Sequence, residues 1–93
     1  MSADLSQIPE ANVPMRELTF GEKAVGIKFN PGNHTQVDEI KDIFAKAIDY
    51  LDSIRNPNDG SMQKAEVARM LSIAITELQT SQMWAVKAVT WQY

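Results

Sequence analysis

The sequence predicts an all-α fold in which a short N-terminal helix precedes a long antiparallel two-helix hairpin. Apolar residues recur at steps of three and four over residues 37–54 and again over residues 67–88, as they do along one face of an α-helix. The segment NPNDG at residues 56–60 separates these two stretches and has the composition of a turn. Thr19 and Glu22 have the spacing of a capping box, which predicts where the short helix begins.

Composition sets limits on the class of protein. A chain of 93 residues forms one domain at most and buries a small share of its surface, so it benefits from oligomerisation. It has no cysteine, which excludes disulfides and thiolate metal sites and fits a reducing compartment. A net charge of −3 argues against binding to duplex nucleic acid but allows a small anion in a local pocket. The chain shows no secretory signal and no run of the roughly 20 apolar residues that a membrane span needs, so we expect a soluble, cytosolic protein.

The N-terminal part divides into an arm and the start of the domain. Residues 1–14 are polar, contain two prolines and show no periodic spacing of apolar residues. This composition is typical of a flexible arm. The hairpin domain is expected over residues 15–93. After the cap at Thr19, the short helix spans about two turns and ends at Gly26.

The first long helix is expected to begin after Thr35 as its N-cap and to end near Arg55. The loop that follows turns the chain back, and the second long helix is expected to start at Ser61. The apolar stripe of the first long helix comprises Val37, Ile40, Phe44, Ala47, Leu51 and Ile54. On the second long helix, the stripe expected to pack against the first long helix comprises Val67, Leu71, Ala74, Leu78, Ser81, Ala85 and Ala88.

A second set of large apolar residues in the last helix does not fit that stripe. A two-helix hairpin has no third long helix to cover them, and a large exposed apolar surface usually marks an interaction site. We therefore expect the hairpins to assemble as an oligomer in which neighbouring copies cover these residues. The expected interface residues are Met70, Ile73, Met83, Trp84 and Trp91.

Enzymatic functions find little support in the sequence. The one histidine, His34, stands in a predicted turn with no second histidine or nucleophile in motif spacing. All-helical nucleotide hydrolases hold Mg²⁺ with pairs of acids one turn apart on two helices. Such pairs do occur, but on a single helix: Glu39 with Asp42, and Asp49 with Asp52. A solvated acidic face explains them, so we expect no metal, no cofactor and no catalytic residue, with a Mg²⁺-dependent hydrolase as an alternative.

The region around the short helix carries cationic and aromatic side chains. The segment FGEKAVG lacks the Gly-Lys-Ser/Thr ending of a phosphate loop. Aromatic rings stack on bases, and arginine and lysine pair with phosphates, so this region is a candidate nucleotide site. Many surface helices carry similar groups, so the signal is weak. The side chains concerned are Arg16, Phe20, Lys23, Lys28 and Phe29.

Three segments resemble a known family. RELTFGEKAVGIKFNPG, VDEIK and AITELQTSQMWAVKAVTW together look like the hairpin domain shared by two kinds of bacteriophage sponge, over about residues 15–91. Anti-CBASS sponges sequester cyclic di- and trinucleotides, and Thoeris anti-defence sponges sequester cyclic ADP-ribose signals. The resemblance implies a homohexamer of interlocked helical proteins in the host bacterial cytoplasm. Its pockets lie between subunits and close over cyclic nucleotides without cleaving them.

The resemblance also implies ligand-binding positions. Met15 stands where anti-CBASS sponges have a stacking tyrosine before RELT, and Lys41 in VDEIK matches a ligand-contacting lysine. Phe20 or Phe29 would supply a ring in place of that tyrosine. Arg16 either pairs with a phosphate or forms an ion pair with Glu17 or Glu22. The expected ligand-binding set is Met15, Arg16, Phe20, Lys23, Phe29 and Lys41.

Two further alternatives remain beside binding of cyclic di- and trinucleotides and the Mg²⁺-dependent hydrolase. Sequestration of cyclic ADP-ribose would use the same kind of domain, and a plain helical oligomerisation module would show the same apolar stripes without any ligand.

Overall fold

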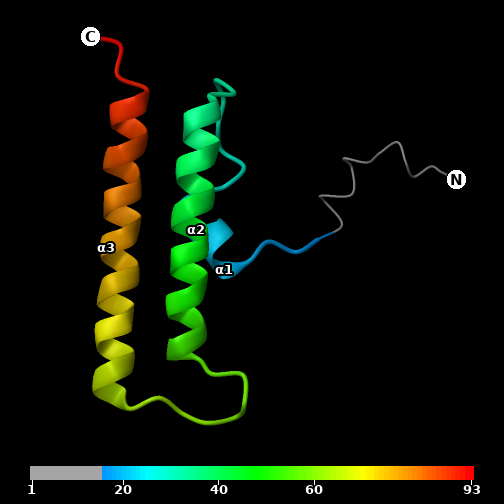
Figure 1. Ribbon diagram of the computed structural model, residues 1–93, viewed down its shortest axis with the longest axis vertical. Helices are drawn as coiled ribbons and strands as arrows, with labels where there is room; N and C mark the ends of the chain where they lie inside the picture. Colours follow the sequence, from blue (N-terminus) through cyan, green and yellow to red (C-terminus); the bar gives the residue numbers. More distant parts are fainter. Residues whose placement is uncertain (1–15) are drawn as a thin grey trace, which may run out of the picture.

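The structure is a computed structural model that describes residues 16–93. Three helices follow in order: α1 (Phe20–Val25), α2 (Thr35–Arg55) and α3 (Ala65–Val89). Figure 1 shows α2 and α3 side by side and antiparallel, with α1 lying against α2. The predicted all-α hairpin is therefore confirmed over the part of the chain that the structure describes. The predicted arm at residues 1–14 and the predicted ligand contact Met15 lie outside the described residues.

α1 begins and ends where the sequence predicts. The hydroxyl of Thr19 accepts a hydrogen bond from the Glu22 amide at 3.1 Å, and the Glu22 carboxylate accepts one from the Thr19 amide at 2.9 Å. Gly26 ends the helix in the left-handed conformation, with φ of 64°, which a glycine adopts without steric cost. A helix of six residues is too short to be stable alone, so α1 depends on these caps and on its contact with α2.

α2 begins one residue earlier than predicted. Its N-cap is His34, whose Nδ1 accepts a hydrogen bond from the Gln36 amide at 3.2 Å, and Thr35 is already the first helical residue. The prediction of Thr35 as the cap is wrong because a neutral imidazole nitrogen accepts a bond from the helix start as a hydroxyl does. The histidine therefore has a structural role at the helix start.

α3 begins later than predicted, at Ala65 and not at Ser61. Both the amide and the hydroxyl of Ser61 donate to Oδ1 of Asp59, at 2.9 and 2.6 Å, which keeps Ser61 in the loop. The Gln63 side chain donates to the carbonyl oxygen of Ile54 at 3.2 Å and ties the loop back to the end of α2. The connection is longer than predicted because these local bonds compete with the first turn of a helix.

The hydrophobic core joins all three helices. The predicted stripe of α2 packs against it through partly buried residues such as Phe44 and Leu51. Two residues outside that stripe, Ala45 and Ile48, are more deeply buried because α1 covers a second side of α2. The buried residues of this cluster are Val25, Ala45, Ile48 and Ile75, and Val37 of the predicted stripe is buried as well.

The inner face of α3 is rotated relative to the prediction. Ser81 and Ala88 were expected to face the first long helix, but both are exposed, while Ile75 and Gln82 are buried. α3 lies against both α2 and α1, and Gln79 reaches a backbone carbonyl of α1 at 3.5 Å. The second contact turns the helix away from the face that a two-helix hairpin alone would bury. Among residues 16–93, no helix has the length and apolar character needed to cross a membrane.

Candidate ligand-binding site

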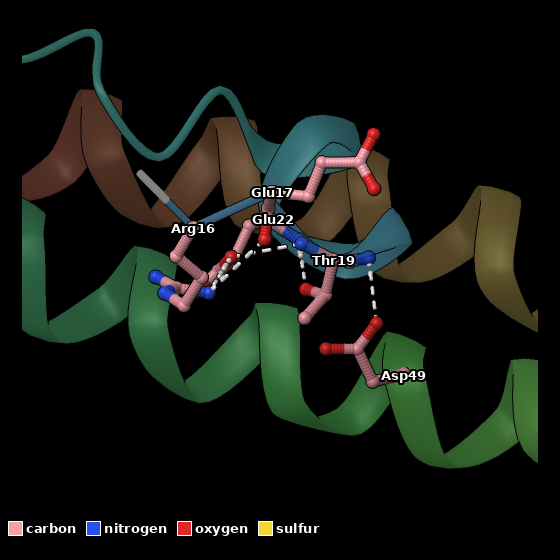
Figure 2. A network of polar contacts seen from close by, with 6 residues as sticks. Arg16, Glu17, Thr19, Glu22 and Asp49 are labelled. Atoms are coloured by element: carbon pink, nitrogen blue, oxygen red, sulfur yellow. Dashed lines mark hydrogen bonds and ion pairs between the residues drawn. The ribbon is translucent and has the colours of Figure 1, made fainter. Parts of the chain in front are cut away.

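α1 is fastened to α2 by a close approach of backbone. The amide of Gly21 donates to Oδ1 of Asp49 at 2.7 Å (Figure 2). A Cβ atom at position 21 would lie 2.1 Å from the carbonyl oxygen of Ala45, so only glycine fits there. This contact determines where the side chains of the short helix stand relative to α2.

Arg16 is held at the start of α1 by Glu22. Its two terminal nitrogens donate to the two carboxylate oxygens of Glu22 at 2.9 and 3.1 Å, and the same carboxylate accepts the Thr19 amide (Figure 2). The hydrogen bond from Arg16, followed by that from the Thr19 backbone, lowers the pKa of Glu22 below its ordinary value. Of the ion pairs considered for Arg16, the structure contains the one with Glu22. The guanidinium stays at the surface, where an anion can reach it.

Lys41 anchors the loop between α1 and α2. It is 5% exposed, and its ammonium donates to the carbonyl oxygen of Gly26 at 3.0 Å and to that of Phe29. Its Nζ also stands 5.4 Å from the centre of the Phe29 ring. An ammonium has three donors, so two are used on the loop and one remains. The sequence pattern could not reveal this anchoring role because the acceptors are backbone carbonyls.

Asn30 closes the same loop onto the start of α2. Its Nδ2 donates to the carbonyl oxygen of His34 and to Oδ1 of Asp38, both at 2.8 Å, and its Oδ1 accepts the His34 amide at 3.1 Å. Asn33, with φ of 53°, makes the tight turn between them. These bonds give the loop a defined shape, which a preformed binding site requires.

A pocket lies between this loop and the ends of the two long helices. Its volume is about 220 Å³. The loop, the first turns of α2 and the last turns of α3 all contribute to its wall. Residues lining it include Phe29, Pro31, Val37, Lys41, Val86 and Thr90. Sequence reasoning identified Phe29 and Lys41 but missed the contribution of α3, which is distant in the chain and has no motif to mark it.

The other predicted ligand residues do not line this pocket. Phe20 lies at the opposite end of α1 from the loop, with the guanidinium of Arg55 5.5 Å from its ring centre. Lys23 is exposed, and its side chain forms no hydrogen bond or ion pair within residues 16–93. The structure therefore brings Phe29 and Lys41 together, and places Arg16 and Phe20 at the other end of the short helix.

The predicted interface residues are all exposed in the single chain. Exposed fractions are 51% for Met70, 46% for Ile73, 60% for Met83, 67% for Trp84 and 61% for Trp91. All five belong to α3 or directly follow it. A row of large apolar side chains on one helix is an unusual surface for an isolated small domain.

Three of the four carboxylates considered as metal ligands have other partners. Asp42 pairs with Lys46 at 2.8 Å, Asp52 pairs with Arg55 at 2.7 Å, and Asp49 holds α1. No group of three or more histidine, aspartate or glutamate side chains within residues 16–93 is placed to hold a metal ion. Asp42, Asp49 and Asp52 thus have structural contacts, and Glu39 lies exposed on the surface of α2.

Comparison with known proteins identifies the hairpin. The family described as Acb2/Tad1, hairpin domain, matches residues 22–90, from within α1 to the end of α3. This range includes Lys23, Phe29 and Lys41, whereas Arg16 and Phe20 precede it. No curated protein and no solved structure matches the chain. Because the match covers well over half of its residues, the chain belongs to the Acb2/Tad1 hairpin domain family, the family of the anti-CBASS and Thoeris anti-defence sponges.

Proposed function

We propose that this protein binds cyclic dinucleotides, with cyclic trinucleotides as a further ligand class, and sequesters these second messengers without cleavage. In this role a bacteriophage would use it in the cytoplasm of its host to block CBASS-type signalling. The observation that carries the proposal is the family match over residues 22–90. Sequestration needs tight binding and many copies of the protein, and it needs no catalytic group.

The anchored loop supports binding of a nucleobase. Phe29 is 72% exposed, so its ring is available for stacking. The loop that carries it is held by Lys41 and Asn30, and a ring on a preformed loop loses little conformational freedom when a base stacks on it. Lys23 on α1 supplies an exposed cation for the two or three phosphates of such a ligand, and the exposed guanidinium of Arg16, paired with Glu22, lies before the other end of α1.

The size of the pocket supports an assembly of several copies. Pockets that bury small ligands measure roughly 300–1,000 Å³. The pocket of one chain, at about 220 Å³, is too small to enclose a cyclic dinucleotide. We therefore propose that a neighbouring copy completes the site in a homohexamer, and that Met70, Ile73, Met83, Trp84 and Trp91 form the contacts between copies.

A second ligand class follows from the family's double name. Because the matched domain is described as Acb2/Tad1, cyclic ADP-ribose signals of Thoeris defence are the alternative cargo. These molecules also combine a purine with phosphates, so the same stacking ring and cations would serve them.

Paired variants test the proposal. We expect Arg16→Ala/Lys41→Ala to lose binding of cyclic dinucleotides in equilibrium dialysis while the oligomer remains intact. Arg16→Ala/Lys23→Ala changes only exposed side chains and leaves the loop anchor in place. Lys46→Ala/Arg69→Ala removes two exposed, ion-paired cations elsewhere and serves as the control. Full affinity in both ligand-site double variants would rule out the assignment of these residues.

A further inference from the structure

The outer surface of α3 carries a seven-residue repeat. One row of its exposed residues follows alternating steps of three and four, which is the spacing of a coiled-coil seam. We call this row the outer stripe of α3. It consists of Met70, Ile73, Glu77, Thr80, Trp84 and Lys87, and Trp91 continues the spacing just beyond the end of the helix. All seven are exposed in the single chain, so the seam has no partner within residues 16–93.

The outer stripe is complementary to itself when one copy is reversed. Glu77 and Lys87 lie at equal distances along the chain on either side of position 82, and so do Thr80 and Trp84. Ile73 and Trp91 complete the same series. A two-fold axis at the level of position 82 would therefore place Glu77 of each copy opposite Lys87 of the other. It would also place the large Trp84 opposite the small Thr80.

We propose that two copies of the chain pair through their α3 helices in an antiparallel, two-fold symmetric seam, with Glu77 of each facing Lys87 of the other. A two-fold contact of this kind uses the same surface on both copies, so each favourable pair occurs twice. This seam specifies one contact between copies in the proposed oligomer, and it rests on the proposed function. It says nothing about which ligand is bound.

Charge determines the direction and the register of the pairing. In a parallel pair in register, Glu77 would face Glu77 and Lys87 would face Lys87, and like charges across an interface are strongly disfavoured. If an antiparallel pair slid by one heptad, Glu77 would face Thr80 or pass beyond the end of the chain. The register centred on position 82 is the arrangement that places both acids opposite both bases.

The surface of α3 has a hollow suited to this arrangement. A shallow pocket of about 310 Å³ is lined by Thr80, Met83, Trp84 and Lys87. In the proposed register the Trp84 ring of the second copy faces Thr80, at the edge of this hollow. Lys87 stands 5.7 Å from the Trp84 ring and 6.0 Å from the Trp91 ring of its own chain, which keeps its ammonium within the seam. A tryptophan seated in a hollow beside a small side chain resembles the central anchor of a stable interface.

Charge reversal tests the register directly. Glu77→Lys and Lys87→Glu are prepared as single variants, as the double variant Glu77→Lys/Lys87→Glu, and as an equimolar mixture of the two singles. Their association is measured by analytical ultracentrifugation, with circular dichroism to follow helix content. Glu39→Lys, an equal change at an exposed site of α2, is the control.

The seam predicts a specific pattern. Each single variant places like charges opposite each other twice and weakens its own pairing by about tenfold or more. The mixture pairs as strongly as the wild type, because one variant then supplies only lysines and the other only glutamates. The double variant also self-associates normally, which shows that the substitutions permit folding. Single variants that associate like the wild type, or a mixture that fails to associate, would overturn the seam. Ligand binding that survives in such variants would leave the proposed function standing.

Discussion

The amide of Gly21 donates a hydrogen bond to Oδ1 of Asp49 at 2.7 Å, at a point where the backbone of α1 comes too close to α2 to leave room for a side chain at position 21. This one contact positions α1, and α1 in turn leads into the loop that carries Phe29. The shape of the candidate site therefore depends on a glycine that has no part in binding chemistry.

Replacing this glycine tests that dependence. Gly21→Ala would place a methyl group 2.1 Å from the carbonyl oxygen of Ala45, so α1 must shift or detach. We expect a loss of about 1–3 kcal/mol in the free energy of unfolding, measured by urea denaturation at a fixed protein concentration. Gly32→Ala is the matched control because no atom lies within 4 Å of its added Cβ. Equal stability of the two variants would contradict this account of the docking.

Lys41 offers a test of its anchoring role. Lys41→Met keeps much of the buried stem but leaves the carbonyl oxygens of Gly26 and Phe29 without their donor. We expect a cost of about 1–3 kcal/mol, because unpaired buried polar groups are expensive. Lys46→Met, at an exposed lysine on the same helix, should change stability by less than about 0.5 kcal/mol. If Lys41→Met were as stable as the control yet lost ligand binding, the ammonium would serve the ligand and not the loop.

The ion pair of Glu22 makes part of the stability dependent on pH. The hydrogen bond from Arg16 lowers the pKa of Glu22 in the folded state below its ordinary value of 4.5. A carboxylate with a lowered pKa stabilises the fold above the ordinary value, and this contribution is lost as pH falls through the folded-state pKa. We expect the melting temperature of the wild type to fall more steeply below pH 4.5 than that of Glu22→Gln. Parallel curves for the two proteins would mean that the pair contributes nothing.

Phe29 should matter for binding and not for folding. Its ring is 72% exposed, so Phe29→Ala should leave the melting temperature of the free protein nearly unchanged. Stacking of a base on an aromatic ring contributes about 1–3 kcal/mol, which corresponds to a loss of about 5- to 150-fold in affinity. Isothermal titration with a cyclic dinucleotide measures this loss. Tyr93→Ala removes a ring that is 99% exposed at the end of the chain and should bind normally.

The sequence predicted the elements well because their signals are local. The capping pair of Thr19 and Glu22, the stop at Gly26 and the apolar period of the long helices all depend on neighbouring residues. The start of α3 was misplaced because Asp59 and Ser61 form bonds that compete with a helix turn. Capping by the imidazole of His34 was missed because a serine or threonine is the usual signal.

The packing and the site were less predictable because they depend on contacts between distant segments. The burial of Ala45 follows from the close approach of α1, and the sequence predicted that short helix without indicating where it packs on the hairpin. The pocket joins the loop around Phe29 to the last turns of α3, and no spacing in the sequence records that contact. The aromatic and cationic residues were recognisable by type, but their grouping at the two ends of α1 required the structure.

A thermal melting series shows whether the protein sequesters a cyclic nucleotide. The purified protein is melted with cyclic dinucleotides, cyclic trinucleotides and cyclic ADP-ribose isomers over a range of concentrations, and the ligand is then recovered by heating. A ligand that binds the folded state alone raises the melting temperature as its concentration increases. We predict such a rise for at least one cyclic nucleotide, with that ligand recovered chemically unchanged. No rise across the whole series, or a ligand recovered as a cleaved product, would contradict the account.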